Sequence, residues 1–235
     1  MRSIALLAAL FGLALLTGLT LFYGLSAVMA AVASSRWATA LVVAVRAAAL
    51  AGAGIGWWAL VPARQPGSSA FVVLRFIREA INSFFPVVVI GGDVIGARLL
   101  ARFGVIVDLG ARLQQIWRNH RGLSESFVVH LAAVFFGAAE VWIALAFMGH
   151  PVSLIEAVAI ESLGQGGRAA AFMLPGGLGV QDGALIAVCA IFGVPAEIAL
   201  AMALIKRVPD LVLGAPALLG WQALEGRRRV LIAND

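Results

Sequence analysis

The sequence predicts an all-α integral membrane protein, and three observations support this class. Of the 235 residues, 62% are hydrophobic and only 12% are charged, whereas an ordinary soluble domain is roughly half apolar and a quarter charged. The mean hydropathy is +1.01. The apolar residues form runs of helix length, about 20 residues for each crossing, rather than the short alternating segments of a β-barrel. We therefore expect a single transmembrane domain over residues 1–235, built as a multi-spanning helical bundle.

The charged residues exclude several other classes. The net charge of +5 is carried almost wholly by arginine, in short segments between apolar runs, which is typical of cytoplasmic loops that face anionic lipid head groups rather than of nucleic-acid binding. The single cysteine, Cys189, rules out an intrachain disulfide. The sequence shows no nucleotide-binding loop, metal-ligand spacing or catalytic constellation, so we expect neither a cofactor nor an enzyme.

The apolar runs divide the chain into seven segments. We expect transmembrane helices at 4–33, 37–61, 127–148 and 195–224, broken hairpins at 71–107 and 152–192, and a cytoplasmic loop at 108–126. The first apolar run is far longer than the ~7–15 residues of a signal-peptide core, which favours a retained first helix. Pro209 is expected to kink the last helix, because proline removes a backbone hydrogen bond.

Each predicted hairpin contains a proline and glycine break. "FFPVVVIGGD" (Phe84–Asp93) and "MLPGGLGVQD" (Met173–Asp182) both place an aspartate seven residues after a proline. Irregular backbone at membrane depth is tolerated only where it is buried in protein or lines a water-filled cavity, so the breaks are candidate binding sites. Capping of the next helix explains the two aspartates as well as ligand contact does. The candidate residues are Pro86, Gly91, Gly92, Asp93, Pro175, Gly176, Gly177 and Asp182.

The basic segments predict how the breaks are placed. Arg227–Arg229 put the C-terminus in the cytoplasm, and the arginines of 108–126 put that loop there too. As a helix, residues 71–85 would span only about 22 Å, so 71–107 is predicted to be re-entrant from the cytoplasm and 152–192 from the opposite face. The breaks would then meet near the midplane as an inverted repeat, a pattern that marks transport sites. In the alternative, each broken segment forms two full crossings.

A polar stripe on one helical face precedes each break and contains both a base and an acid. Charge at the membrane centre costs several kcal/mol unless it is paired or hydrated, which favours a functional role over decoration. In the alternative, the acids and bases only neutralise one another and join helices. The stripes consist of Arg75, Arg78, Glu79 and Asn82 before the first break, and of Glu161, Gln165 and Arg168 before the second.

Two further candidate groups lie inside predicted helices. Glu140 is deep within 127–148, so it must pair with a base such as Arg168 or Arg207, stay protonated, or face water as a proton-coupling carboxylate. In the last helix, Asp210 is spaced to pair with Lys206 or Arg207. Arg46, His130 and His150 are expected to be satisfied packing residues.

Four ordered segments carry a resemblance to a known family. They are "RFIREAINSFFPVVVIGGDVIGARLL" (Arg75–Leu100), "AEVWIAL" (Ala139–Leu145), "ESLGQGGRAAAFMLPGGLGVQDGALI" (Glu161–Ile186) and "LIKRVPDLVLGAPALLGWQALEG" (Leu204–Gly226). Together they resemble the lysylphosphatidylglycerol synthetase transmembrane-region family, and within it the branch encoded with hopanoid biosynthesis genes, the HpnL type. The chain departs from this family by lacking about two helices between Val105 and Arg118. It also carries Asp182 and Asp210 where glutamate is expected.

The resemblance implies a flippase-like, multi-pass domain of the bacterial inner membrane whose partners are membrane lipids, with lipid-biosynthesis enzymes as further candidates. The substrate it implies is a hopanoid or another polar-headed lipid, bound in a midplane cavity by the arginines of the stripes. Two other hypotheses stay open. One is an intramembrane transferase with Glu140 or Asp182 as the base, and the other is a scaffold for lipid-biosynthesis enzymes that transports nothing.

Overall fold

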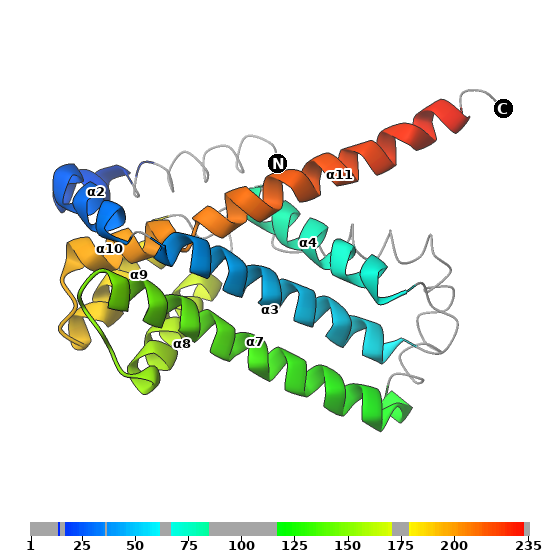
Figure 1. Ribbon diagram of the computed structural model, residues 1–235, viewed down its shortest axis with the longest axis horizontal. Coiled ribbons are helices and arrows are strands. Elements are labelled where there is room, and N and C mark those ends of the chain that lie inside the picture. The colour runs from blue at the N-terminus through cyan, green and yellow to red at the C-terminus, as the bar shows by residue number, and fades with distance from the viewer. Residues whose placement is uncertain are drawn as a thin grey trace.

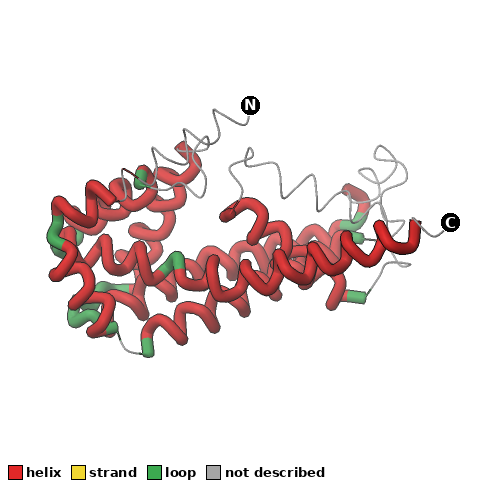
Figure 2. The backbone as a smooth tube through the Cα atoms, turned by 90° about the horizontal axis from the view of Figure 1, so that it is seen from above, coloured by secondary structure: helices red, strands yellow, loops and turns green. Residues whose placement is uncertain are grey.

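A computed structural model describes residues 14, 17–35, 37–61, 67–84, 117–170 and 179–232, without the side chains of Arg168 and of residues 223–232. Over these residues the chain is all-helical and contains no strand (Figure 2), so the predicted all-α class is confirmed there. The helices are α2 (Leu25–Ser34), α3 (Ala38–Leu60), α4 (Ser68–Phe84), α7 (His120–Phe147), α8 (Leu154–Ala170), α9 (Val180–Ile191), α10 (Ala196–Ile205) and α11 (Val208–Ile232).

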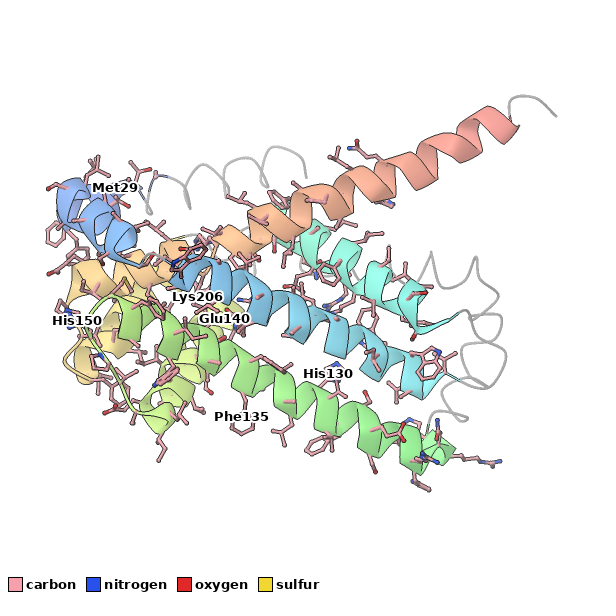
Figure 3. The ribbon with its side chains drawn as sticks, in the orientation of Figure 1. Met29, His130, Phe135, Glu140, His150 and Lys206 are labelled. Carbon is pink, nitrogen blue, oxygen red and sulfur yellow. The ribbon has the colours of Figure 1, made fainter. Side chains whose placement is uncertain are left out.

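Within the described residues, two helices, α3 and α7, are long and apolar enough to cross a membrane. They contain 23 and 28 residues, and at 1.5 Å per residue they are about 35 and 42 Å long, against a hydrocarbon core of about 30 Å. Only 28% and 33% of their most apolar windows are buried, whereas the core helix of a soluble protein is mostly buried. Phe135 points away from the bundle (Figure 3). Their apolar outer faces therefore suit contact with lipid.

The other helices are arranged around α3 and α7, which lie side by side and antiparallel (Figure 1). Helix α4 packs on α3 and on α11. Helices α2, α8, α9 and α10 gather at the end of the bundle at the left of Figure 1, and α11 runs from there towards the C-terminus at the opposite end. The end of α3, the beginning of α7 and the end of α11 therefore all face the same side of the molecule.

Glycines allow α3 to approach its neighbours closely. A Cβ atom on Gly54 would lie 2.7 Å from the Cα of Val72, so the backbones of α3 and α4 touch there. A Cβ on Gly56 would lie 3.2 Å from a methyl group of Val129 on α7. Small residues are the usual means of close helix packing in membranes, because lipid removes the hydrophobic drive that joins helices in water.

The structure differs from the sequence-based boundaries at two of the predicted transmembrane helices and at the polar loop. The segment 4–33 is not one continuous helix, because the chain turns at Gly24, which has φ +89°. Helix α7 begins at His120, so the second part of the predicted loop 108–126 is helical. The Asn119 side chain caps this start by accepting a hydrogen bond of 3.0 Å from the N–H of Gly122.

The third boundary that differs lies in the last predicted helix, 195–224. It is divided into α10 and α11, which are separated at Lys206 and Arg207, and α11 continues to Ile232. The irregularity expected at Pro209 is present as this break rather than as a kink in one helix, because α10 ends at Ile205, whose carbonyl would otherwise accept from the N–H that Pro209 lacks. Pro209 lies in the first turn of α11, where a helix tolerates a residue without an N–H.

The predicted hairpins are described only in part. Helices α8 and α9 pack against each other, and the break at 171–178 between them lies outside the described residues. Of the first hairpin the structure describes α4, while residues 85–116 lie outside. The inverted repeat and the meeting of the two breaks therefore stay predictions.

The close approach at Gly54 gives a first testable prediction. Gly54→Ala should destabilise the protein by about 1–3 kcal/mol, because the added methyl group meets backbone rather than a side chain that can move. The midpoint of unfolding in detergent, followed by tryptophan fluorescence, measures this effect. Gly166→Ala is the control, since nothing lies within 4 Å of its added Cβ. Equal midpoints for both variants would contradict the packing described here.

Candidate functional site

Charged side chains gather inside the bundle where α3, α7, α8 and α9 meet the break between α10 and α11. Glu140 is 0% exposed, and Glu161, Asp182 and Lys206 are also buried. Glu140 and Lys206 lie close together in the interior (Figure 3). We call this group the charged centre. It consists of Arg46, Glu140, Glu161, Asp182, Lys206 and Arg207.

Glu140 is paired with two bases. The Nη2 of Arg46 donates a hydrogen bond of 2.7 Å to the Oε2 of Glu140, and the Nζ of Lys206 lies 3.6 Å from the same oxygen. The predicted partner Arg207 binds Asp182 instead, and Arg168 has no described side chain. Arg46 was expected to be a packing residue. The sequence signal for a role of Arg46 was its position, because Arg46, like Glu140, lies well inside a predicted transmembrane helix.

Lys206 also binds a second carboxylate, that of Glu161. The Nζ of Lys206 donates to the Glu161 carboxylate and to the carbonyl oxygen of Gly137, at 3.4 Å. Gln165 donates a hydrogen bond of 2.9 Å to the Oε1 of Glu161. A Cβ on Gly137 would lie 2.7 Å from this Oε1, so the glycine makes room for the carboxylate. Lys206 thus joins α7 to α8.

Asp182 joins α9 to the beginning of α11. The Nη2 of Arg207 donates to both carboxylate oxygens of Asp182, at 3.0 and 2.8 Å. The N–H of Gly179 donates to the same carboxylate at 2.8 Å, which satisfies one of the free donors at the start of α9. Asp182 is therefore the third residue of α9 rather than its N-cap, which is Gly179, but its carboxylate still caps the N-terminal turn and also binds an arginine.

The break between α10 and α11 suits the charges placed on it. Lys206 and Arg207 follow the last residue of α10, where the helix dipole favours positive charge, and Asp210 lies in the first turn of α11, where it favours negative charge. Helices that are interrupted near their charged residues are characteristic of transport sites in membranes. This break is distinct from the two predicted from the sequence.

The first polar stripe forms a separate cluster on α4. Arg75 and Arg78 lie 3.7 and 3.8 Å from the Oε2 of Glu79. Both guanidinium groups also lie over the ring of Trp57, 5.1 and 5.5 Å from its centre, an arrangement that stabilises a cation against an aromatic face. The three charged residues of this stripe are therefore close together, as their spacing predicts. The mutual neutralisation of these charges agrees with the alternative in which the acids and bases of a stripe only join helices.

Among the described residues, two small pockets adjoin these charges and an apolar groove adjoins one of the pockets. The inner pocket, of about 20 Å³, is lined by Gln165, Gln181 and Asp182 together with the bases of the charged centre and Asp210. The outer pocket, of about 10 Å³, has Arg46, Glu79, Ser83 and Asp210 as its polar lining. The apolar groove, of about 580 Å³, lies between α4 and α11. Arg46 and Asp210 line both pockets, while Phe76 and Leu213 line both the outer pocket and the groove.

The structure brings together seven of the eighteen predicted site residues. Glu140, Glu161, Gln165, Asp182 and Arg207 meet in or beside the charged centre, and Asp210 and Glu79 line the pockets. Asn82 is half-buried on α4. The described residues contain no group of three or more His, Cys, Asp or Glu placed to hold a metal ion. Outside the described residues lie Pro86, Gly91, Gly92, Asp93, Pro175, Gly176, Gly177 and the Arg168 side chain.

Comparisons with known proteins found no similar family. No family model and no curated protein matches the sequence, and no solved structure matches this fold. The resemblance to the lysylphosphatidylglycerol synthetase transmembrane region therefore stays a prediction.

The pairing of Arg46 with Glu140 gives a second testable prediction. Glu140→Leu should destabilise the protein by about 3–5 kcal/mol, since it leaves Arg46 without the carboxylate that binds it at 2.7 Å. Arg46→Leu combined with Glu140→Leu should lose clearly less than the sum of the two single variants. Reversible unfolding in detergent micelles measures all three variants.

The exposed pair of Arg121 and Glu125, whose side chains are 90% and 50% exposed, provides the matched control. Its coupling energy should be about 0.3–0.5 kcal/mol, because water screens exposed pairs on a helix. If the losses of Arg46→Leu and Glu140→Leu were simply additive, the buried pair would not be a unit of the structure.

Proposed function

We propose that this chain is a flippase-like membrane protein that binds or translocates a polar-headed lipid. The observation that carries the proposal is the continuity between the apolar groove and the outer pocket through Phe76 and Leu213. A lipid is itself apolar along most of its length and polar at one end. A site for it needs an apolar surface that runs directly into a polar one.

The groove supplies the apolar part of such a site. It is lined by aliphatic and aromatic side chains of α4 and α11, among them Val72, Val73 and Val212, and none of the described residues in its lining is charged. Its volume of about 580 Å³ lies within the usual range for small-molecule sites, about 300–1,000 Å³. We infer that it holds the acyl or polycyclic part of the lipid.

The charged centre and the outer pocket supply the polar part. Replacing a buried ion pair with apolar residues is often neutral or stabilising, so stability alone gives little reason to keep several buried pairs. Small pockets with polar walls lie between these pairs and the groove. These features support head-group contact at Arg46, Glu79 and Asp210. A hopanoid, the substrate that the family resemblance implies, is included in this proposal.

The proposal includes a location in the bacterial inner membrane, with several crossings and a cytoplasmic C-terminus. Exposed Arg121 lies at the beginning of α7, on the same side of the bundle as the end of α11, and basic residues favour the cytoplasm.

A third prediction tests this orientation. Green fluorescent protein fused after Asp235 should fluoresce in a bacterial host, while alkaline phosphatase fused at the same place should be inactive. The reverse pattern would contradict a cytoplasmic C-terminus.

A fourth prediction tests lipid binding. Val73→Trp should fill part of the groove and reduce both the lipid that copurifies with the protein and the rate of lipid movement in reconstituted vesicles by several-fold. Copurified lipid is measured by mass spectrometry, and movement by dithionite quenching of a fluorescent phospholipid.

Val134→Trp on α7 is the matched control, because Val134 is 44% exposed and Val73 is 51% exposed, and Val134 is not part of the groove lining. It should leave both measurements unchanged. Lipid binding and movement that are equal in the wild type and in Val73→Trp would refute the groove as the lipid site.

A further inference from the structure

The inner and outer pockets share a wall formed by Arg46 and Asp210. Arg46 comes from the middle of α3, and Asp210 comes from the first turn of α11. Together with the groove, the two pockets form a series from the outer face of α4 and α11 towards α8 and α9. The two polar pockets therefore have one basic and one acidic residue in common.

Some residues that line the two pockets carry buried polar atoms without a hydrogen-bond partner. The Nε of Arg46 and the Oγ of Ser83 are buried and make no hydrogen bond, and the same holds for the Nε of Arg207. The first two belong to residues of the outer pocket, and Arg46 and Arg207 belong to the inner pocket. Buried polar groups are almost always satisfied by protein or by water. The volumes of about 10 and about 20 Å³ are each the size that one water molecule needs.

Three other carboxylates of this region are held by bases. Glu140 is bound by Arg46, and Glu161 is bound by Lys206. Both carboxylate oxygens of Asp182 accept hydrogen bonds from the Nη2 of Arg207. Asp210 differs from them in its position, because its residue lies on the walls of both pockets.

We propose that each pocket holds a water molecule and that Asp210 passes a proton between the two. A hydronium ion in one pocket transfers its proton to a carboxylate oxygen of Asp210 and becomes water. The protonated carboxyl group then transfers that proton to the water of the other pocket, which restores the carboxylate. The inference rests on the proposed function. It adds that proton transfer through Asp210 regulates or drives the movement of lipid.

The charged groups around Asp210 explain how its proton would affect the lipid. They come from every element that lines the two pockets: Arg46 of α3, Glu79 of α4, Asp182 of α9, and Lys206 and Arg207 of the turn before α11, with Glu140 of α7 and Glu161 of α8 behind them. Protonation removes one negative charge from the outer pocket, where the head group binds. Proton binding and head-group binding are then thermodynamically coupled, each changing the affinity for the other.

The experiment uses the full chain in vesicles that contain a fluorescent phosphatidylethanolamine and an internal pH-sensitive dye. An imposed pH gradient should raise the rate of lipid movement by the wild type several-fold, and the dye should report proton movement. Asp210→Asn should lose this stimulation, so that its rate of lipid movement is the same with and without the gradient. Asp210→Glu should restore it, because a carboxyl group is again present.

Glu125→Gln, which removes an exposed acid on α7, is the control and should keep the full stimulation. A wild type that carries lipid but does not respond to the gradient would overturn the inference and leave the proposed function in place. The same holds if Asp210→Asn keeps the response. Absence of copurified lipid from the wild type would instead refute the proposed function itself. Loss of the response in both Asp210→Asn and Asp210→Glu, with unfolding in each, would assign Asp210 a structural role and overturn the inference.

Discussion

The pairing of buried charges around Glu140 is the constraint on which the rest of the structure depends. A charge that is fully buried and unpaired costs several kcal/mol, so Glu140 requires Arg46 and Lys206 to be present at the same time. Lys206 in turn holds Glu161. The partners come from α3, α7, α8 and the turn after α10, so a shift of any one helix along its axis by a turn would leave a charge without its partner.

The apolar surfaces of the helices supply no comparable constraint. In a membrane, lipid tails are as apolar as leucine, so apolar contact alone does not select one helix register. The selection comes from the ion pairs and from positions where only glycine fits, such as Gly54 against α4 and Gly137 against the Glu161 carboxylate. The exposed apolar side chains of α3 and α7 suit contact with lipid but do not by themselves select a register.

The difference between apolar surfaces and specific pairings explains what could be predicted from the sequence. The position of α3 follows from the length of an apolar run, and the polar stripe on α4 follows from helical spacing. The partner of Glu140 could not be predicted, because Arg46 is 94 residues away in the chain and only the tertiary packing brings them together. The division between α10 and α11 was hidden because the apolar run continues across it. Pro209 indicated an irregularity, but the helix ends before it. The start of α7 was missed because polar residues 120–126 read as a loop, although Asn119 caps a helix there.

Helix α11 links the polar and apolar parts of the candidate site. It carries Asp210 in its first turn and Leu213, Pro216 and Gly220 along the groove. Pro216 has no N–H, so the carbonyl of Val212 loses its usual partner inside the helix, and such positions are where helices bend. A bend at Pro216, or a rotation of α11 at the break before it, would move Asp210 relative to Arg46 and reshape the groove in the same motion. The charges at the beginning of α11 and the apolar groove farther along it are therefore carried by the same helix.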